Sequence, residues 1–160
     1  MITFRTHSSD DTRTLAGVIA RLARERDIIL LCGNMGSGKT TFAQGFARGL
    51  GVAEAVVSPT YTLVREYAAR LRLHHVDVYR LDHHQEVIDL GLNEMLDDGG
   101  VTLIEWGDVA EPLLPRDYLQ VHLELTDDPD VRLVSLSATG SPWAGRDAEL
   151  RRAVTHWVER

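Results

Sequence analysis

The sequence predicts an α/β fold in a single domain, with a mostly parallel central sheet flanked by helices and with additional antiparallel hairpins. Three observations predict it: an apolar run over residues 28–32, a glycine-rich loop over residues 33–40, and a helical pattern over residues 41–50. A short apolar run of this kind is typical of a strand that is buried on both faces. At 160 residues, the chain is long enough for one full core and short for two.

The loop reads Gly33-Asn34-Met35-Gly36-Ser37-Gly38-Lys39-Thr40, which fits the pattern G-x-x-x-x-G-K-[ST]. Glycines let such a loop curl until its backbone N–H groups converge on phosphate oxygens, and the next helix directs its positive end at the same place. Lys39 would reach the β- and γ-phosphates of a nucleotide, and Thr40 would offer its hydroxyl to Mg²⁺. The alternative is an ordinary glycine turn, but the flanking strand and helix favour a P-loop NTPase-like domain.

Composition supports this interpretation. Lys39 is the only lysine among the 17 basic residues, and an ammonium fits between phosphate oxygens in a tight loop better than a planar guanidinium does. A net charge of -7 argues against unaided binding of DNA or RNA over a broad surface. The single cysteine, Cys32, and the absence of a long apolar segment lead us to expect a cytoplasmic protein with no membrane partner.

The elements before and after the loop follow from local patterns. A short strand is predicted over residues 2–5, and residues 8–11 offer N-cap side chains to a helix with apolar residues at helical spacing up to Leu22. After the second helix, Val56 to Val64 begins as an extended segment, because the residue before Pro59 is disfavoured in a helix. Thr60 or Thr62 could then sense a γ-phosphate, and a plain surface turn is the alternative.

Two strands are predicted over residues 63–67 and 71–79, joined as a hairpin. Alternation along the second strand places His75 and Asp77 on one face and His74 on the other. Because metal ligands must converge, we expect no zinc site from His74, His75 and the His83-His84 pair, and we interpret them as ordinary polar positions.

A helix is predicted from a capping box at Asp82 through Leu96, ending at Asp98-Gly99. The apolar run over residues 101–104 then ends in Glu105, so that a carboxylate emerges at the carboxyl end of a buried strand, where ligands of open α/β sheets bind. Asp77 and Glu105 compete as the carboxylate that orients Mg²⁺; we expect both to act, with Glu105 nearest the metal. Strands over residues 118–125 and 131–138 and a final helix complete the chain.

Four segments, in this order and spacing, resemble the TsaE (YjeE) family, bacterial ATPases required to make threonylcarbamoyladenosine in tRNA. They are Gly33 to Thr41, Ser58-Pro59-Thr60-Tyr61-Thr62-Leu63-Val64, His75-Val76-Asp77-Val78-Tyr79-Arg80-Leu81 and Ile104-Glu105-Trp106. The resemblance covers essentially the whole chain and weakens after Asp108. One departure is Asn34, where the family often has an acidic residue.

The resemblance implies a set of site residues. ATP would be held by Gly33, Gly36, Ser37, Gly38, Lys39, Thr40, Thr41 and Asp77, and Mg²⁺ by Thr40 and Glu105. Catalysis would involve Glu105, Asp77 and Lys39, while Ser58, Thr60, Tyr61, Thr62 and Trp106 would belong to switch-like segments. Contacts to the adenine would come from Asp11 and Arg132.

The resemblance also implies partners. In the family, TsaE docks on a heterodimer of TsaB and TsaD, and TsaD transfers threonylcarbamoyl from an adenylate made by TsaC. The ATPase cycle of TsaE supports turnover of that complex, and tRNA is met indirectly, through the partners.

Two other classes compete with this interpretation. A small-molecule kinase of the shikimate kinase type has a similar loop, but it needs an arginine-bearing lid, and no arginine-rich segment suitable for one follows Val87. A non-hydrolysing, nucleotide-gated interaction module remains open. A regulatory GTPase is excluded, because its guanine-reading motif requires a second lysine.

Overall fold

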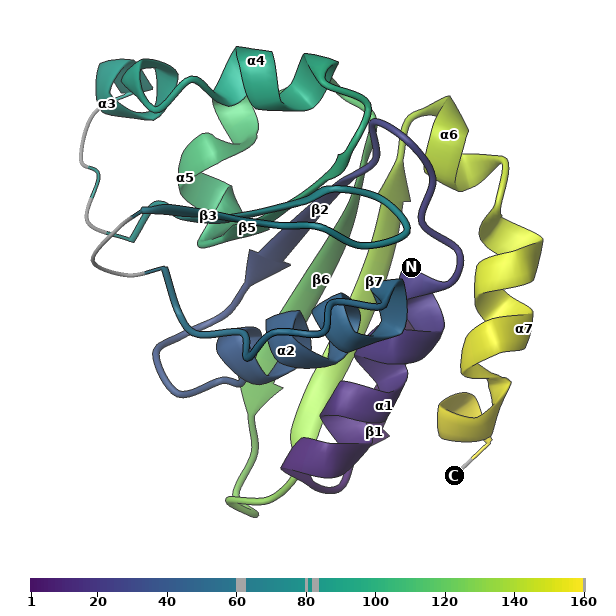
Figure 1. Cartoon of the computed structure of the whole chain (residues 1–160). Coiled ribbons are helices and arrows are strands. Elements are labelled where there is room, and N and C mark those ends of the chain that lie inside the picture. The colour runs from purple at the N-terminus through teal and green to yellow at the C-terminus, as the bar shows by residue number, and fades with distance from the viewer. Residues whose placement is uncertain (60–62, 80, 82–83, 160) are drawn as a thin grey trace.

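The computed structural model describes residues 1–59, 63–79, 81 and 84–159 of the chain (Figure 1). Its strands are β1 (Ile2–Thr6), β2 (Ile28–Cys32), β3 (Val64–Tyr67), β4 (Leu73–Asp77), β5 (Val101–Glu105), β6 (Tyr118–Leu125) and β7 (Arg132–Thr139). Its helices are α1 (Ser9–Ala20), α2 (Lys39–Leu50), α3 (His84–Asp89), α4 (Leu92–Asp97), α5 (Gly107–Ala110), α6 (Ser141–Ala144) and α7 (Asp147–Val158), with a 3₁₀ turn over Glu111–Leu113.

All seven strands form one mixed sheet in the order β1-β7-β6-β2-β5-β4-β3. The four central strands, β6, β2, β5 and β4, run parallel to one another. The β1, β7 and β3 strands pair antiparallel at the two margins. The predicted α/β fold is therefore confirmed, but the sheet is mixed instead of mostly parallel, because parallel pairing is confined to the four central strands and antiparallel pairs lie at both margins.

The apolar run of β2 is explained by its position at the centre of this sheet. Ile29 and Leu31 face a core formed with α1, α2, α6 and α7, whereas Ile28, Leu30 and Cys32 face a second core formed with α4 and α5. Both faces of the strand are thus covered, and all five residues are buried. Figure 1 shows α1 and α2 lying side by side across the first of these faces.

One helix prediction is wrong. The segment expected to form a single helix through Leu96 forms two short ones, α3 and α4. Gly91 separates them with φ of 77°, a left-handed conformation that interrupts helical hydrogen bonding and that glycine adopts without strain. The proposed capping residue, Asp82, lies outside the described residues.

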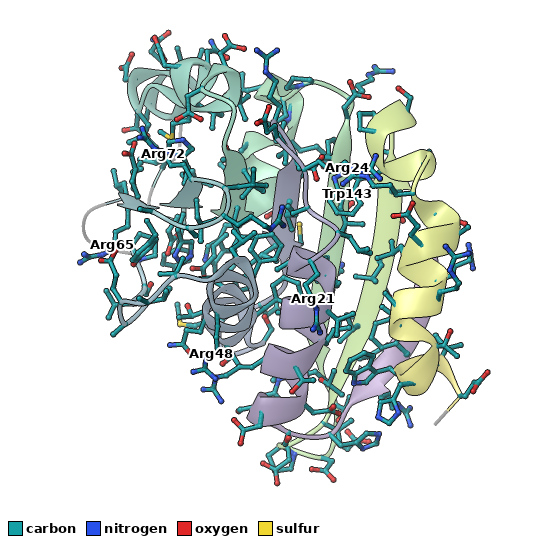
Figure 2. All side chains as sticks on the ribbon, turned by 45° about the vertical axis from the view of Figure 1, so that its right-hand side comes forward. Arg21, Arg24, Arg48, Arg65, Arg72 and Trp143 are labelled. Carbon is teal, nitrogen blue, oxygen red and sulfur yellow. The ribbon has the colours of Figure 1, made fainter. Side chains whose placement is uncertain are left out.

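A buried ion pair links the segment between α6 and α7 to the residue that precedes β2. Arg146 donates to both carboxylate oxygens of Asp27, at 2.7 and 2.6 Å, and its side chain and that of Asp27 are 2% and 4% exposed. The guanidinium also lies over the Trp143 ring, 3.9 Å from the ring centroid. Trp143 is fully buried and lies between the sheet and the C-terminal helices (Figure 2).

His74 makes a second buried polar contact, on the face of β4 that lies away from α2. Its Nε2 bonds to Asp98, and its Nδ1 lies 3.3 Å from a carboxylate oxygen of Glu66. Burial of the Asp98 carboxyl opposes its ionisation, but the bonds from the Gly100 N–H and from His74 outweigh burial. The pKa of Asp98 is therefore lowered below its ordinary value.

This shift predicts how Asp98 stabilises the protein at different pH values. A carboxyl with a lowered pKa in the folded state stabilises the fold above the unfolded-state pKa of about 3.9, and that stabilisation is lost as the pH falls through the folded-state pKa. We expect Asp98→Asn to lower the free energy of unfolding by about 1–2 kcal/mol at pH 7, and by progressively less below about pH 4. Urea unfolding across this range measures the difference. The exposed neighbour Asp97, changed to Asn, serves as the control, and an Asp98→Asn effect that stays constant down to pH 3 would contradict the prediction.

No helix in the described part of the chain has the length and apolar character needed to cross a lipid bilayer.

Candidate functional site

The glycine loop and two carboxylates meet at one edge of the sheet. Because β2, β5 and β4 are parallel neighbours, their carboxyl ends lie together, and Asp77 is paired directly with Glu105. A cavity of about 400 Å³ opens there. Its lining comes from the loop, the start of α2 and the ends of β4 and β5: Met35, Gly36, Gly38, Lys39, Thr40, Thr41, Ser58, Asp77, Tyr79, Glu105 and Trp106.

The loop has the backbone that a phosphate cradle requires. Gly36 and Gly38 have φ of 78° and 104°, and a Cβ atom built on either would meet nothing within 4 Å. Gly33 has φ of 144°, and a Cβ atom there would lie 2.3 Å from the Leu123 carbonyl oxygen, so this position excludes every other residue. The first N–H groups of α2, which follow directly on the loop, have no side-chain cap.

Lys39 is the first residue of α2, and its side chain reaches back into the loop. Its Nζ donates to the carbonyl oxygens of Gly33, at 2.7 Å, and of Asn34, at 2.9 Å, and lies 3.5 Å from the Ser37 hydroxyl oxygen. The ammonium also lies 3.8 Å from the centroid of the Trp106 ring. Burial lowers the pKa of Lys39, although the Glu105 and Asp77 carboxylates oppose the change.

Thr40 and Glu105 are in direct contact. The Thr40 hydroxyl donates to Oε1 of Glu105 at 3.0 Å, and Glu105 is almost completely buried. The other carboxylate oxygen, Oε2, lies 2.6 Å from Nε2 of His75. One oxygen of the Glu105 carboxylate thus contacts Thr40, next to the loop, and the other contacts His75, on the neighbouring strand.

Asp77 is the second carboxylate. It is buried, and its Oδ1 accepts the Tyr79 N–H at 2.9 Å. The Tyr79 ring packs against that of Trp106 with 4.7 Å between centroids. Trp106 has φ of 63°, a left-handed conformation that is strained for a bulky residue and that is often found at functional sites.

Arg132 lies on the outer side of the loop. Its Nε donates to the Ser37 carbonyl oxygen at 3.0 Å, and its Nη2 to that of Gly36 at 3.3 Å. A smaller cavity, of about 90 Å³, lies between this arginine, the loop and the start of α1. The Asp11 carboxylate is not part of either cavity lining, because it accepts from Nε1 of Trp157 and from the His7 N–H, both at 2.9 Å.

The structure brings most of the expected residues together. Gly33, Gly36, Ser37, Gly38, Lys39, Thr40, Thr41, Asp77, Glu105 and Trp106 all lie in or against the loop and its cavity, and Ser58 lines the cavity from the other side. Thr60, Tyr61 and Thr62, expected to form a switch-like segment, lie outside the described residues.

Sequence reasoning missed His75, which it treated as an ordinary polar position. The available signal was alternation, since His75 shares a face of β4 with Asp77. What the sequence does not state is the pairing of β4 with β5, which brings His75 within reach of Glu105.

A larger cavity, of about 630 Å³, lies between α1 and α2 and is lined in part by Asp10, Arg13, Arg21 and Arg48. Figure 2 labels Arg21 and Arg48, which are exposed on this side of the molecule. This cavity contains neither the loop backbone nor the carboxylates at the strand ends. We therefore take the cavity of about 400 Å³, where a cation, a hydroxyl and two carboxylates converge, as the candidate functional site.

The fold and the site define an α/β protein in which a glycine loop joins a central parallel strand to a helix, beside carboxylates from two neighbouring strands. The chain belongs to the TsaE family, because residues 6–133 match the family described as "Threonylcarbamoyl adenosine biosynthesis protein TsaE".

Relatives across bacteria support this assignment. The chain is 39% identical over 150 residues to the "tRNA threonylcarbamoyladenosine biosynthesis protein TsaE" of Bacillus subtilis, covering 93% of each chain. It is 37% identical over 145 residues to the protein of the same name from Streptomyces coelicolor, covering 86% of this chain and 97% of that one. The crystal structure of YdiB from Bacillus subtilis superposes with a TM-score of 0.82 at 36% identity and covers 94% of both chains.

Proposed function

We propose that this protein is a P-loop NTPase-like, Mg²⁺-dependent ATPase that acts in the synthesis of threonylcarbamoyladenosine in tRNA. The observation that carries the proposal is the convergence, in one cavity, of the glycine loop, the only lysine and the Thr40–Glu105 pair. Family membership supports the pathway, since the relatives carry the name of that pathway.

The loop would bind the phosphates. The backbone N–H groups at the start of α2 and the positive helix end attract anions, and the glycine backbone leaves the space beside the loop open. Lys39 is held now by two carbonyl oxygens of the loop, and it would exchange these partners for phosphate oxygens. The exchange is favourable because a hydrogen bond from the ammonium to a charged phosphate oxygen is stronger than one to a neutral carbonyl oxygen.

The residues present also fit a magnesium ion. Mg²⁺ prefers oxygen ligands and is commonly held by one or two carboxylates together with substrate phosphates, and the Thr40 hydroxyl and Glu105 carboxylate supply such oxygens side by side. Asp77 adds a third oxygen donor residue to the same cavity. When bound, the ion neutralises charge on the β- and γ-phosphates. Thr40 and Glu105 would hold it, and Lys39 would stabilise the charge that develops on the transferred group.

The protein would act with partners in the cytoplasm. Its net charge of -7 is unfavourable for gripping tRNA unaided, which supports an indirect role through TsaB and TsaD. The first experiment is ATP hydrolysis by the chain alone and with TsaB, TsaD and tRNA of the same organism. Slow turnover that rises with the partners supports the proposal, whereas turnover that ignores them and requires a small acceptor supports a kinase.

Glu105→Ala separates an ATPase from a nucleotide-gated binding module. We expect affinity for ATP to remain within about threefold, because the loop and Lys39 are intact, while hydrolysis falls by about two orders of magnitude through loss of a preorganised charged group. Calorimetry with a non-hydrolysable ATP analogue and phosphate release measure the two effects. Glu94→Ala, an exposed carboxylate on α4, is the matched control, and unchanged hydrolysis in Glu105→Ala would rule out the proposed role of this residue.

A further inference from the structure

We propose that His75 is a positioning residue that orients the Glu105 carboxylate toward Thr40. The inference rests on the proposed function, which gives roles to Lys39, Thr40 and Glu105 but none to His75. Its basis is a chain of contacts from the interior of the sheet to the glycine loop: His75 to Glu105, and Glu105 to Thr40.

The two oxygens of Glu105 have different partners. Oε1 accepts from the Thr40 hydroxyl at 3.0 Å, on the side of the cavity, and Oε2 lies 2.6 Å from His75, on the side of the core. A carboxylate held at only one oxygen rotates about its side-chain bonds, whereas one held at both is fixed in plane and direction. His75 is completely buried, so its ring is itself locked in place by packing.

The contact also defines which nitrogen of His75 carries a proton. A carboxylate oxygen only accepts hydrogen bonds, so Nε2 must be the donor. Nδ1 is buried and has no hydrogen-bond partner among the described residues. The geometry therefore places a hydrogen on Nε2, the nitrogen that contacts Glu105.

Without this donor, Oε2 of Glu105 would be a buried charged oxygen with one partner fewer. The carboxylate would regain rotational freedom and spend less time aligned with the Thr40 hydroxyl. The affinity of the site for a divalent cation would fall, while phosphate binding by the loop and Lys39 would not. Residues that orient metal ligands in this way typically change metal affinity by about 10- to 100-fold when they are replaced.

The neighbouring residue provides a matched control. His74 is on the same strand, is equally inaccessible, and also contacts carboxylates, those of Glu66 and Asp98. It lies on the opposite face of β4, in contact with neither Glu105 nor the loop. Replacing His74 and His75 by the same residue compares two buried histidines that both contact carboxylates, of which only one is connected to the site.

The experiment uses the full chain as His75→Met, His75→Gln and His74→Met. Methionine fills a similar volume without a donor, and glutamine keeps an N–H near the position of Nε2. Affinity for Mn²⁺ is measured by electron paramagnetic resonance in the presence of a non-hydrolysable ATP analogue, and affinity for the same analogue is measured separately in EDTA. Urea unfolding reports the stability of each variant.

We expect His75→Met to weaken Mn²⁺ binding by about 10- to 100-fold, with binding of the analogue in EDTA unchanged within about twofold. His75→Gln should restore Mn²⁺ affinity to within about threefold of the wild type. His74→Met should lower stability without changing Mn²⁺ affinity. Equal Mn²⁺ affinity in His75→Met and wild type, or equal weakening by His74→Met, would overturn the inference.

A spectroscopic measurement on the unmodified protein tests the inference even if His75→Met does not fold. Long-range ¹H–¹⁵N correlation spectra of histidine-labelled protein should show His75 with hydrogen on Nε2, and its signals should shift in Glu105→Gln. A ring without hydrogen on Nε2 would overturn the inference. The two proposals can fail separately. If the wild type binds neither the analogue nor Mn²⁺, the proposed function fails. If His75 still gives the expected spectrum in that case, the contact with Glu105 is present but orients no metal ligand.

Discussion

Replacing Lys39 with alanine is expected to weaken ATP binding by about 100-fold or more. Hydrogen bonds from a charged donor contribute about 1.5–3 kcal/mol each, and each 1.4 kcal/mol changes a dissociation constant about tenfold. Lys39 would make such bonds to phosphate oxygens, because its Nζ is already inside the loop, within 3 Å of two loop carbonyl oxygens. Calorimetric titration with ATP measures the change.

Lys39→Arg is expected to restore little of this loss, although it keeps the charge. The compact ammonium bonds the Gly33 and Asn34 carbonyl oxygens and lies 3.8 Å from the centroid of the Trp106 ring, and a larger, planar guanidinium cannot make the same set of contacts. Arg48→Ala is the control, because it removes an exposed cation from the same helix. ATP binding by Lys39→Ala with wild-type affinity would contradict the proposed role of the loop.

Replacing Arg146 with alanine is expected to lower the free energy of unfolding by about 3–5 kcal/mol, a large part of the 5–15 kcal/mol that stabilises a typical domain. The substitution leaves the Asp27 carboxylate, which is 4% exposed, without the guanidinium that bonds both of its oxygens. It also removes the cation from the Trp143 ring and a donor from the Leu22 carbonyl oxygen. Urea unfolding followed by circular dichroism measures the effect.

Two further variants show which lost interaction destabilises Arg146→Ala. Arg151→Ala breaks an ion pair with Asp147 on the same helix, α7, but both side chains are about half exposed, so we expect a loss of less than about 1 kcal/mol. Replacing Asp27 by leucine together with Arg146 by methionine removes both buried charges, and we expect this pair to be more stable than Arg146→Ala alone. A double variant as unstable as the single one would show that the cost does not arise from the buried carboxylate left without its guanidinium.

The sequence predicted those parts of the site that depend on local patterns. The loop from Gly33 to Thr40 has its own motif, and β2 and β5 are continuous apolar runs because the centre of a covered sheet imposes that composition. Glu105 was expected because it ends such a run. These features depend on residues that are close together in the chain, so they can be read without knowing the sheet order.

The rest depends on contacts between distant segments. Arg132, which only the family resemblance had singled out, reaches the loop because β7 pairs with β6 and β6 pairs with β2. His75 reaches Glu105 because β4 pairs with β5. The break at Gly91 was missed because a single glycine is tolerated within many helices, and only packing decides whether it ends one. The bond between Trp157 and Asp11 joins the two ends of the chain, and no local pattern predicts such a bond.

The pairing of β4 with β5 has a consequence for the evolution of loop lengths in this protein. Side chains alternate along a strand, so sliding β4 by one residue would turn His74 toward the core that contains α2 and would carry His75 and Asp77 to the opposite face. The site would lose a carboxylate and the donor behind Glu105 together, although no residue of the site had been substituted. Insertions or deletions of one residue within the segment that connects β3 to β4, residues 68–72, are therefore expected to be as damaging to the site as substitutions within it.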